Sequence, residues 1–163
     1  MPPEPDESEA ERLNRNFDDL LQELRVSQNG TQILFAFLLT VPFSNGFTKV
    51  TDYEQGVYFT ALLLAALSAA MLIAPAVMHR VLFRQHHKRE LVYTASRVAL
   101  GGQVLLALAV AASVLFVTDF LYSHTLAGVM AFVVLVWTSV WFFVLPLRIR
   151  AKHHRDDDTT SST

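Results

Sequence analysis

The sequence contains no cysteine in its 163 residues. This absence excludes disulfides, zinc–thiolate sites, iron–sulfur clusters and thiolate nucleophiles. The motifs of phosphate-binding loops, serine hydrolases, zinc peptidases and dinucleotide-binding folds are also missing from the sequence. We therefore expect a protein that is not an enzyme and has no catalytic residue, no cofactor and no metal site.

Charge is scarce and unevenly placed along the chain. Asp, Glu, Lys and Arg make up 17% of the residues, whereas 52% are hydrophobic. A helix on the surface of a soluble protein needs a polar face, but long stretches of this chain have none. The period-two alternation of a membrane barrel is missing as well, and the acidic N-terminus lacks the positive region of a signal peptide.

Four apolar segments predict four transmembrane helices, at about residues 31–47, 57–78, 98–118 and 125–147. In hydrocarbon the backbone must satisfy its own hydrogen bonds, so each crossing must be helical. The first crossing, of roughly 17 residues, is at the lower limit for a bilayer core, and Pro42 lies near its end. The expected fold is an all-α, polytopic membrane protein.

Further segments flank these crossings. Residues 1–8 are acidic and proline-rich, which predicts disorder, and Ser8 with Glu11 has the form of a capping box. Residues 9–29 predict an amphipathic helix at the cytoplasmic membrane surface, whose apolar stripe comprises Leu13, Phe17, Leu20, Leu21 and Leu24. Residues 148–163 are expected to form a disordered cytoplasmic tail.

The distribution of lysine and arginine predicts the orientation. The basic residues near the crossings are concentrated between the second and third crossings and after the fourth, whereas the other two connections carry Lys49 alone. Positive residues resist translocation, so both termini are expected in the cytoplasm and the protein in the cell membrane. The concentrated residues are Arg80, Arg84, Lys88, Arg89, Arg97, Arg148, Arg150, Lys152 and Arg155.

The polar face of residues 9–29 is acidic, whereas a helix that binds anionic lipid is normally basic. We therefore expect this helix to dock on the basic segment 79–97, with Glu23, Arg25, Arg80 and Arg84 as candidate docking residues. The doublets His86–His87 and His153–His154 lie among basic residues, which favours binding to anionic lipid headgroups over a metal site.

The centres of the predicted crossings carry no charged residue, which disfavours an ion relay there. Polar residues such as Gln103 have two interpretations, hydrogen bonding between helices or a polar pathway. At the span edges, Asp52, Asp119 and His124 are candidates for an external cation-attracting mouth. Arg97 is a candidate contact for an anionic lipid or carboxylate. In the alternative, Arg97 extends to the headgroups and Asp119 caps the next element.

Two further patterns concern the arrangement of the helices. Alanines four residues apart, at 65 and 69, 66 and 70, and 107 and 111, predict close packing of the second and third crossings, while Trp137 and Trp141 are expected to face lipid. Residues 50–53 (VTDY) recur as 117–120 (VTDF), which indicates either a parallel duplication or a chance match.

Several segments resemble a known family: residues 12–17 and 20–26, the run 34–43, the pairs Ala74–Pro75 and His79–Arg80, and residues 145–148. The chain is similar, over about residues 12–150, to uncharacterised small bacterial four-helix integral membrane proteins. Members of that family are sometimes automatically named sodium:proton antiporters. The resemblance implies a four-helix membrane fold, and it transfers no functional residue.

Two hypotheses on function follow. In the first, the protein is a non-enzymatic accessory or assembly protein of the membrane. In the second, it is a small oligomeric cation or proton transporter, with Asp52 and Asp119 at its mouth. The expected partners are the lipid bilayer, anionic headgroups, and a second copy or another membrane protein, and nucleic acid is not expected.

Overall fold

The computed structural model of the chain describes residues 9–82 and 88–141. Within these residues there are four α-helices, two short 3-10 turns and no strand, which confirms the all-α prediction. The elements are α1 (Glu9–Thr40), η1 (Val41–Phe43), η2 (Phe47–Lys49), α2 (Asp52–Leu82), α3 (Lys88–Leu121) and α4 (His124–Ser139). The predictions for residues 1–8, Arg84, His86–His87 and residues 142–163 fall outside the described residues.

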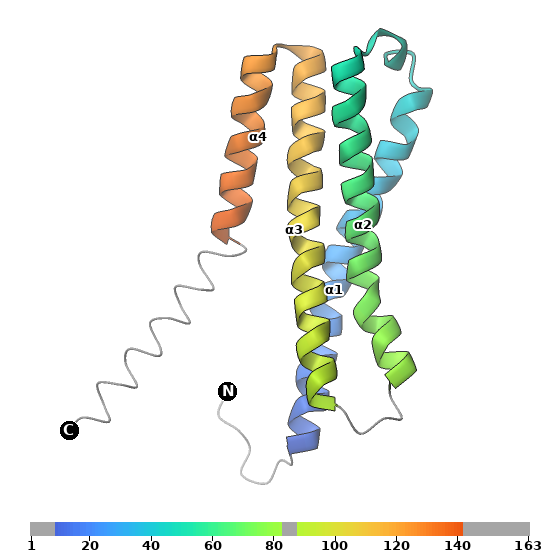
Figure 1. Cartoon of the computed structure of the whole chain (residues 1–163), viewed down its shortest axis with the longest axis vertical. Helices are drawn as coiled ribbons and strands as arrows, with labels where there is room; N and C mark the ends of the chain where they lie inside the picture. Colours follow the sequence, from blue (N-terminus) through green and yellow to red (C-terminus); the bar gives the residue numbers. More distant parts are fainter. Residues whose placement is uncertain (1–8, 83–87, 142–163) are drawn as a thin grey trace, which may run out of the picture.

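The helices form one elongated bundle (Figure 1). α2 and α3 lie side by side at its centre, α4 flanks α3, and α1 runs behind α2 and α3. Residues 41–51 and the α3–α4 turn at 122–123 lie at one end, which we call the connection end. The start of α1, the end of α2 and the start of α3 lie at the opposite end.

Small residues bring α2 and α3 close together. Ala61 and Ala65 on α2 and Ala109 on α3 are fully buried, and the hydroxyl of Ser68 donates to the Gly102 carbonyl oxygen across the interface at 2.8 Å. At Gly102 the approach is so close that an added Cβ would lie 3.2 Å from the Leu72 backbone nitrogen. This packing agrees with the close contact predicted from the alanine spacing.

The first helix differs from the prediction, because α1 is continuous from Glu9 to Thr40 and has no break at Gly30. Leu24, Thr31 and Leu38 recur every seven residues and are all buried, so one face of α1 packs along the bundle on both sides of Gly30. The expected division into a helix at 9–29 and a crossing at 31–47 is therefore not seen. Beyond Thr40, η1 contains Pro42 at the point where the helix was expected to loosen.

A hydrogen bond from α1 lies next to the proline of α2. Pro75 lies inside α2 and is buried, and proline removes a backbone donor and loosens the helical hydrogen bonds before it. The side-chain amide of Gln28 donates to the Leu72 carbonyl oxygen, one turn before Pro75, at 2.6 Å. Leu24 and Leu20 pack beside it against Leu72 and Ala99. The half of α1 away from the connection end is thus held against the bundle by apolar contacts and by the hydrogen bond of the Gln28 amide.

Two helices are long and apolar enough to cross a membrane, over Asp52–Met78 of α2 and Tyr93–Leu121 of α3. In the most apolar part of each, 28% of the residues are buried in the protein. The described part of α4 is apolar but shorter, at 16 residues. Large apolar side chains point outward on several helices, including Phe37, Phe59, Phe132 and Trp137.

Candidate functional site

The start of α2 is closed by a reciprocal cap. The backbone N–H and the hydroxyl of Thr51 both donate to the carboxylate of Glu54, at 2.7 and 2.8 Å. The backbone N–H of Glu54 in turn lies 3.3 Å from the Thr51 hydroxyl oxygen. This is a capping box, in which the side chains of the first turn satisfy its free donors. It keeps Glu54 buried at the connection end.

A second carboxylate is buried nearby, at the last turn of α3. The side chain of Asp119 is 3% exposed, and Nδ1 of His124 lies 2.5 Å from its Oδ1. Neither carboxylate oxygen accepts a hydrogen bond of regular geometry from the part of the chain that the structure describes. A buried carboxylate needs a compensating charge or donors, and the end of a helix is unfavourable for negative charge. The His124 ring supplies the polar contact available to Asp119.

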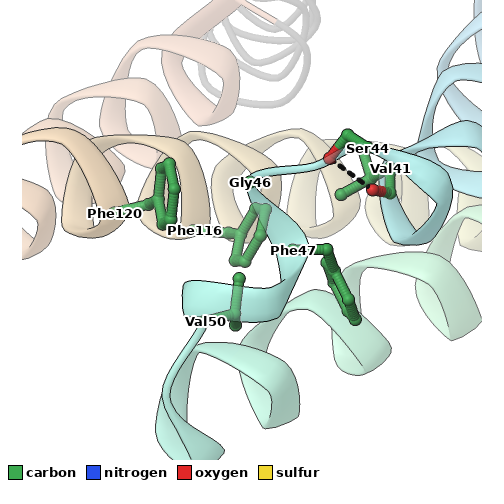
Figure 2. Close-up of a pocket in the computed structure, with 7 residues that line it drawn as sticks. All are labelled: Val41, Ser44, Gly46, Phe47, Val50, Phe116 and Phe120. Atoms are coloured by element: carbon green, nitrogen blue, oxygen red, sulfur yellow. Dashed lines mark hydrogen bonds between the residues drawn. The ribbon is translucent and has the colours of Figure 1, made fainter.

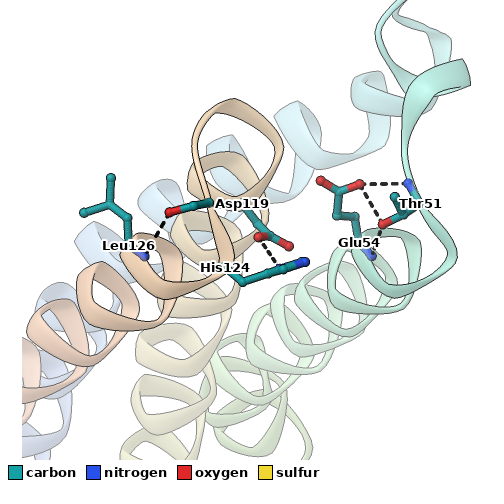
Figure 3. A network of polar contacts seen from close by, with 6 residues as sticks. Thr51, Glu54, Asp119, His124 and Leu126 are labelled. Carbon is teal, nitrogen blue, oxygen red and sulfur yellow. Dashed lines mark hydrogen bonds and ion pairs between the residues drawn. The ribbon is translucent and has the colours of Figure 1, made fainter.

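His124 joins three helices at the connection end. It is the first residue of α4, after Ser123, whose hydroxyl accepts from the Leu126 backbone N–H. Its ring meets Tyr53 of α2 edge to face, with centroids 5.5 Å apart. Figure 3 shows the ring beside the Asp119 carboxylate, pointing from α4 toward the start of α2. The imidazole is mostly exposed, whereas the carboxylate is buried.

The structure thus brings two of the sequence-derived candidates, Asp119 and His124, into direct contact. Asp52 is exposed on the first turn of α2. Gln103 is half-buried on α3. Arg97 is exposed, and its guanidinium lies 4.4 Å from the ring centroid of Tyr93, one turn earlier in α3, as suits a side chain that extends along its own helix. No group of three or more metal-ligating side chains is found among the described residues.

The candidate docking residues lie near the opposite end. Glu23 and Arg25 on α1 and Arg80 on α2 are all exposed. The contacts that anchor this part of α1 run instead through Leu20, Leu24 and Gln28. Docking by charge therefore remains a prediction for these residues, while docking by apolar packing is observed.

An apolar pocket adjoins the connection end. It measures about 160 Å³ and lies between residues 41–50 and the last turns of α3. Phe116 and Phe120 of α3 face Phe47 and Val50 across it (Figure 2). The hydroxyl of Ser44 donates to the Val41 carbonyl oxygen at 2.8 Å. The one hydroxyl that lines the pocket is thus already hydrogen-bonded to the backbone. We therefore interpret the pocket as a packing defect between residues 41–50 and α3.

Sequence reasoning missed three residues of this region: Tyr53, Glu54 and Tyr58. The spacing Thr51-x-x-Glu54 is a recognisable capping box, so Glu54 was open to prediction. Tyr58 is buried, donates to the Leu38 carbonyl oxygen near the end of α1 at 3.0 Å, and contacts Phe47 and Phe116. Its role, like that of Tyr53, depends on contacts between distant segments that carry no local pattern.

The fold is an all-α bundle with two helices suited to crossing a membrane, and its polar cluster lies at the connection end. The chain belongs to the family of unknown function DUF6328, whose family pattern matches residues 6–146. This membership confirms the resemblance to an uncharacterised family. No curated protein and no solved structure matches the chain.

Proposed function

We propose that the protein is an integral membrane protein, with four helices crossing the cell membrane, that acts without catalysis as an accessory or assembly protein. The observation that carries this proposal is the apolar exterior of the bundle. Phe37, Phe59 and Leu67 are each more than half exposed, at 68%, 56% and 55%. A monomeric soluble protein rarely exposes large contiguous apolar patches, whereas lipid covers such a surface without penalty.

The dimensions of the helices support insertion. The 31 residues of α2 extend about 46 Å at 1.5 Å per residue, more than the ~30 Å of a hydrocarbon core. The described part of α4, at 16 residues, is shorter than α2. The predicted fourth crossing extends beyond it to residue 147.

The placement of charge supports an orientation with both termini in the cytoplasm. The half of the bundle away from the connection end contains Arg80, Arg97 and the three arginines of α1. The described residues of the connection end contain one lysine, Lys49, and no arginine. Since positive residues resist export, the connection end is the external one.

The use of polar side chains inside the helices supports assembly. Ser113 and Thr138 donate to carbonyl oxygens of their own helices, and Ser68 donates across the α2–α3 interface. The Ser68 hydroxyl thus contributes to packing between helices, as is common in membrane proteins, whereas those of Ser113 and Thr138 are satisfied within their own helices. Among the described helices α4 packs against α3 alone, and its outer face, with Phe132, Trp137 and Trp141, is the surface that we assign to a neighbour.

Site-specific photo-crosslinking in cells tests this role. Benzoylphenylalanine replaces Phe132 on α4 or, as a matched control, Phe59 on α2, which is exposed to a similar degree. We expect a discrete protein adduct from position 132, either a dimer of this chain or one defined partner, and lipid adducts from position 59. Lipid adducts alone at both positions would argue against assembly through α4.

A second candidate function is a small oligomeric cation or proton transporter, and the burial of the Asp119 carboxylate favours it. Purified protein in liposomes would then carry a pH or sodium flux that Asp119→Asn abolishes and Asp52→Asn reduces. Absence of flux from folded protein would remove this candidate and leave the assembly role.

A further inference from the structure

The contact between Asp119 and His124 lies at the first residue of α4, next to the turn that joins α3 to α4. Among the described helices, α4 packs along its length against α3, and its first residue also reaches α2. His124 meets the buried Asp119 carboxylate of α3 and the Tyr53 ring of α2. A change in this single side chain therefore changes the contacts of α4 with both helices.

The two partners differ in their access to water, which is what a proton-controlled contact requires. The Asp119 side chain is 3% exposed and that of His124 is 77% exposed. Water can deliver a proton to the imidazole without opening the bundle. The imidazolium then faces a carboxylate that has no regular hydrogen bond from the described residues, and a charge-assisted contact is about twice as strong as a neutral one.

The other groups around His124 come from α2, from the α3–α4 turn and from η2. From α2 the ring faces Tyr53, and the Glu54 carboxylate, already held by Thr51, lies on the same side. Asp52 precedes Tyr53 and is exposed, as is Tyr122 in the turn. The one cation of η2, Lys49, is exposed, and residues 31–40 of α1 contain no ionisable side chain. Among the described residues, Asp119 is the buried carboxylate next to His124 that accepts no regular hydrogen bond.

We propose that Asp119 and His124 form a proton-controlled latch that sets the position of α4 against the α2–α3 pair. When the imidazole carries a proton, the ion pair holds the start of α4 against α3 and Tyr53. When the proton leaves, the attraction weakens and α4 is free to move about the turn at residues 122–123. An imidazole side chain changes its charge at pH values near neutrality. The latch therefore closes when the water that surrounds the connection end becomes acidic. This inference is independent of whether the protein acts by assembly or by transport.

The absence of cysteine allows a direct test on the full chain in lipid nanodiscs. Nitroxide labels are attached to cysteines replacing Gly56 on α2 and Gly128 on α4, where an added side chain meets no atom within 4 Å. The distribution of distances between the labels is then measured from about pH 8.5 to pH 5. We expect one narrow population at low pH, and a ratio of closed to open molecules that falls by about five- to tenfold at high pH.

Three variants make the result specific. His124→Gln keeps a hydrogen-bonding side chain without a titrating ring, and Asp119→Asn removes the buried charge; both should abolish the pH dependence while circular dichroism still shows the helices. Asp19→Asn, which removes an exposed carboxylate on α1, is the control and should leave the pH dependence in place. A pH response that persists in His124→Gln, one that disappears in Asp19→Asn, or none in the unmodified sequence would overturn the latch.

Discussion

At the scale of single residues, Gly102 lies where the backbones of α2 and α3 come close together. A Cβ at this position would lie 2.9 Å from Leu72 Cγ and 3.2 Å from the Leu72 backbone nitrogen. The backbone cannot yield as a flexible side chain does, so Gly102→Ala should lower the free energy of unfolding by about 1–3 kcal/mol. Thermal unfolding in detergent, followed by circular dichroism, measures the change.

Two other glycines are matched controls for this prediction. At Gly101 the nearest atom is Met71 Cε, the end of a flexible side chain, and at Gly128 there is open space. Gly101→Ala should therefore be less destabilising, and Gly128→Ala should be neutral or stabilising by up to about 1 kcal/mol. Equal losses for all three variants would contradict the close contact at Gly102.

Gln28 gives a second prediction at this scale. Its amide donates to the Leu72 carbonyl oxygen beside Pro75, so Gln28→Leu removes the donor while keeping the apolar bulk. We expect a loss of about 1 kcal/mol in the free energy of unfolding. Gln22→Leu, at an exposed position on the same helix, should change stability little, and a larger loss from Gln22 than from Gln28 would count against the contact.

At the scale of elements, the capping box decides where α2 begins. Thr51→Ala removes the side chain that exchanges hydrogen bonds with Glu54, at a cost of about 1 kcal/mol. The amide protons of residues 53–55 should then exchange faster with solvent, while those in the middle of α2 are unaffected. Thr51→Ser retains the hydroxyl and should preserve the protection. Unchanged exchange in Thr51→Ala would show that the cap does not hold the first turn.

The elements also show what local pattern predicts well and where it fails. The apolar runs at 57–78 and 98–118 lie within α2 and α3, because a long charge-free segment has few alternatives to a helix. The expected boundary between a helix at 9–29 and a crossing at 31–47 has no counterpart in the backbone of α1, which is helical throughout. The seven-residue spacing of Leu24, Thr31 and Leu38, all buried, indicates one continuous helix. The Thr31 hydroxyl also donates to the Ser27 carbonyl oxygen, within the segment where the boundary was expected.

At the scale of the whole molecule, the grouping of Asp119 with His124 was predicted from the sequence, whereas their direct contact was not. Both residues were selected as members of an external mouth, a function that nothing in the structure tests. Their contact depends on how the turn at residues 122–123 places α4 beside α3. The contact of His124 with Tyr53 depends in addition on the α2–α3 pairing. Contacts of this kind arise from the assembled bundle, and sequence spacing does not encode them.

The central claim is that the bundle spans the cell membrane with its connection end outside. Single cysteines placed at Thr48, exposed at the connection end, and at Gln22, exposed on α1, test it by labelling intact cells with a membrane-impermeant maleimide. The account predicts labelling at position 48 in intact cells and at position 22 only after the membrane is permeabilised. Labelling at position 22 in intact cells, or recovery of the protein in the soluble fraction without detergent, would contradict it.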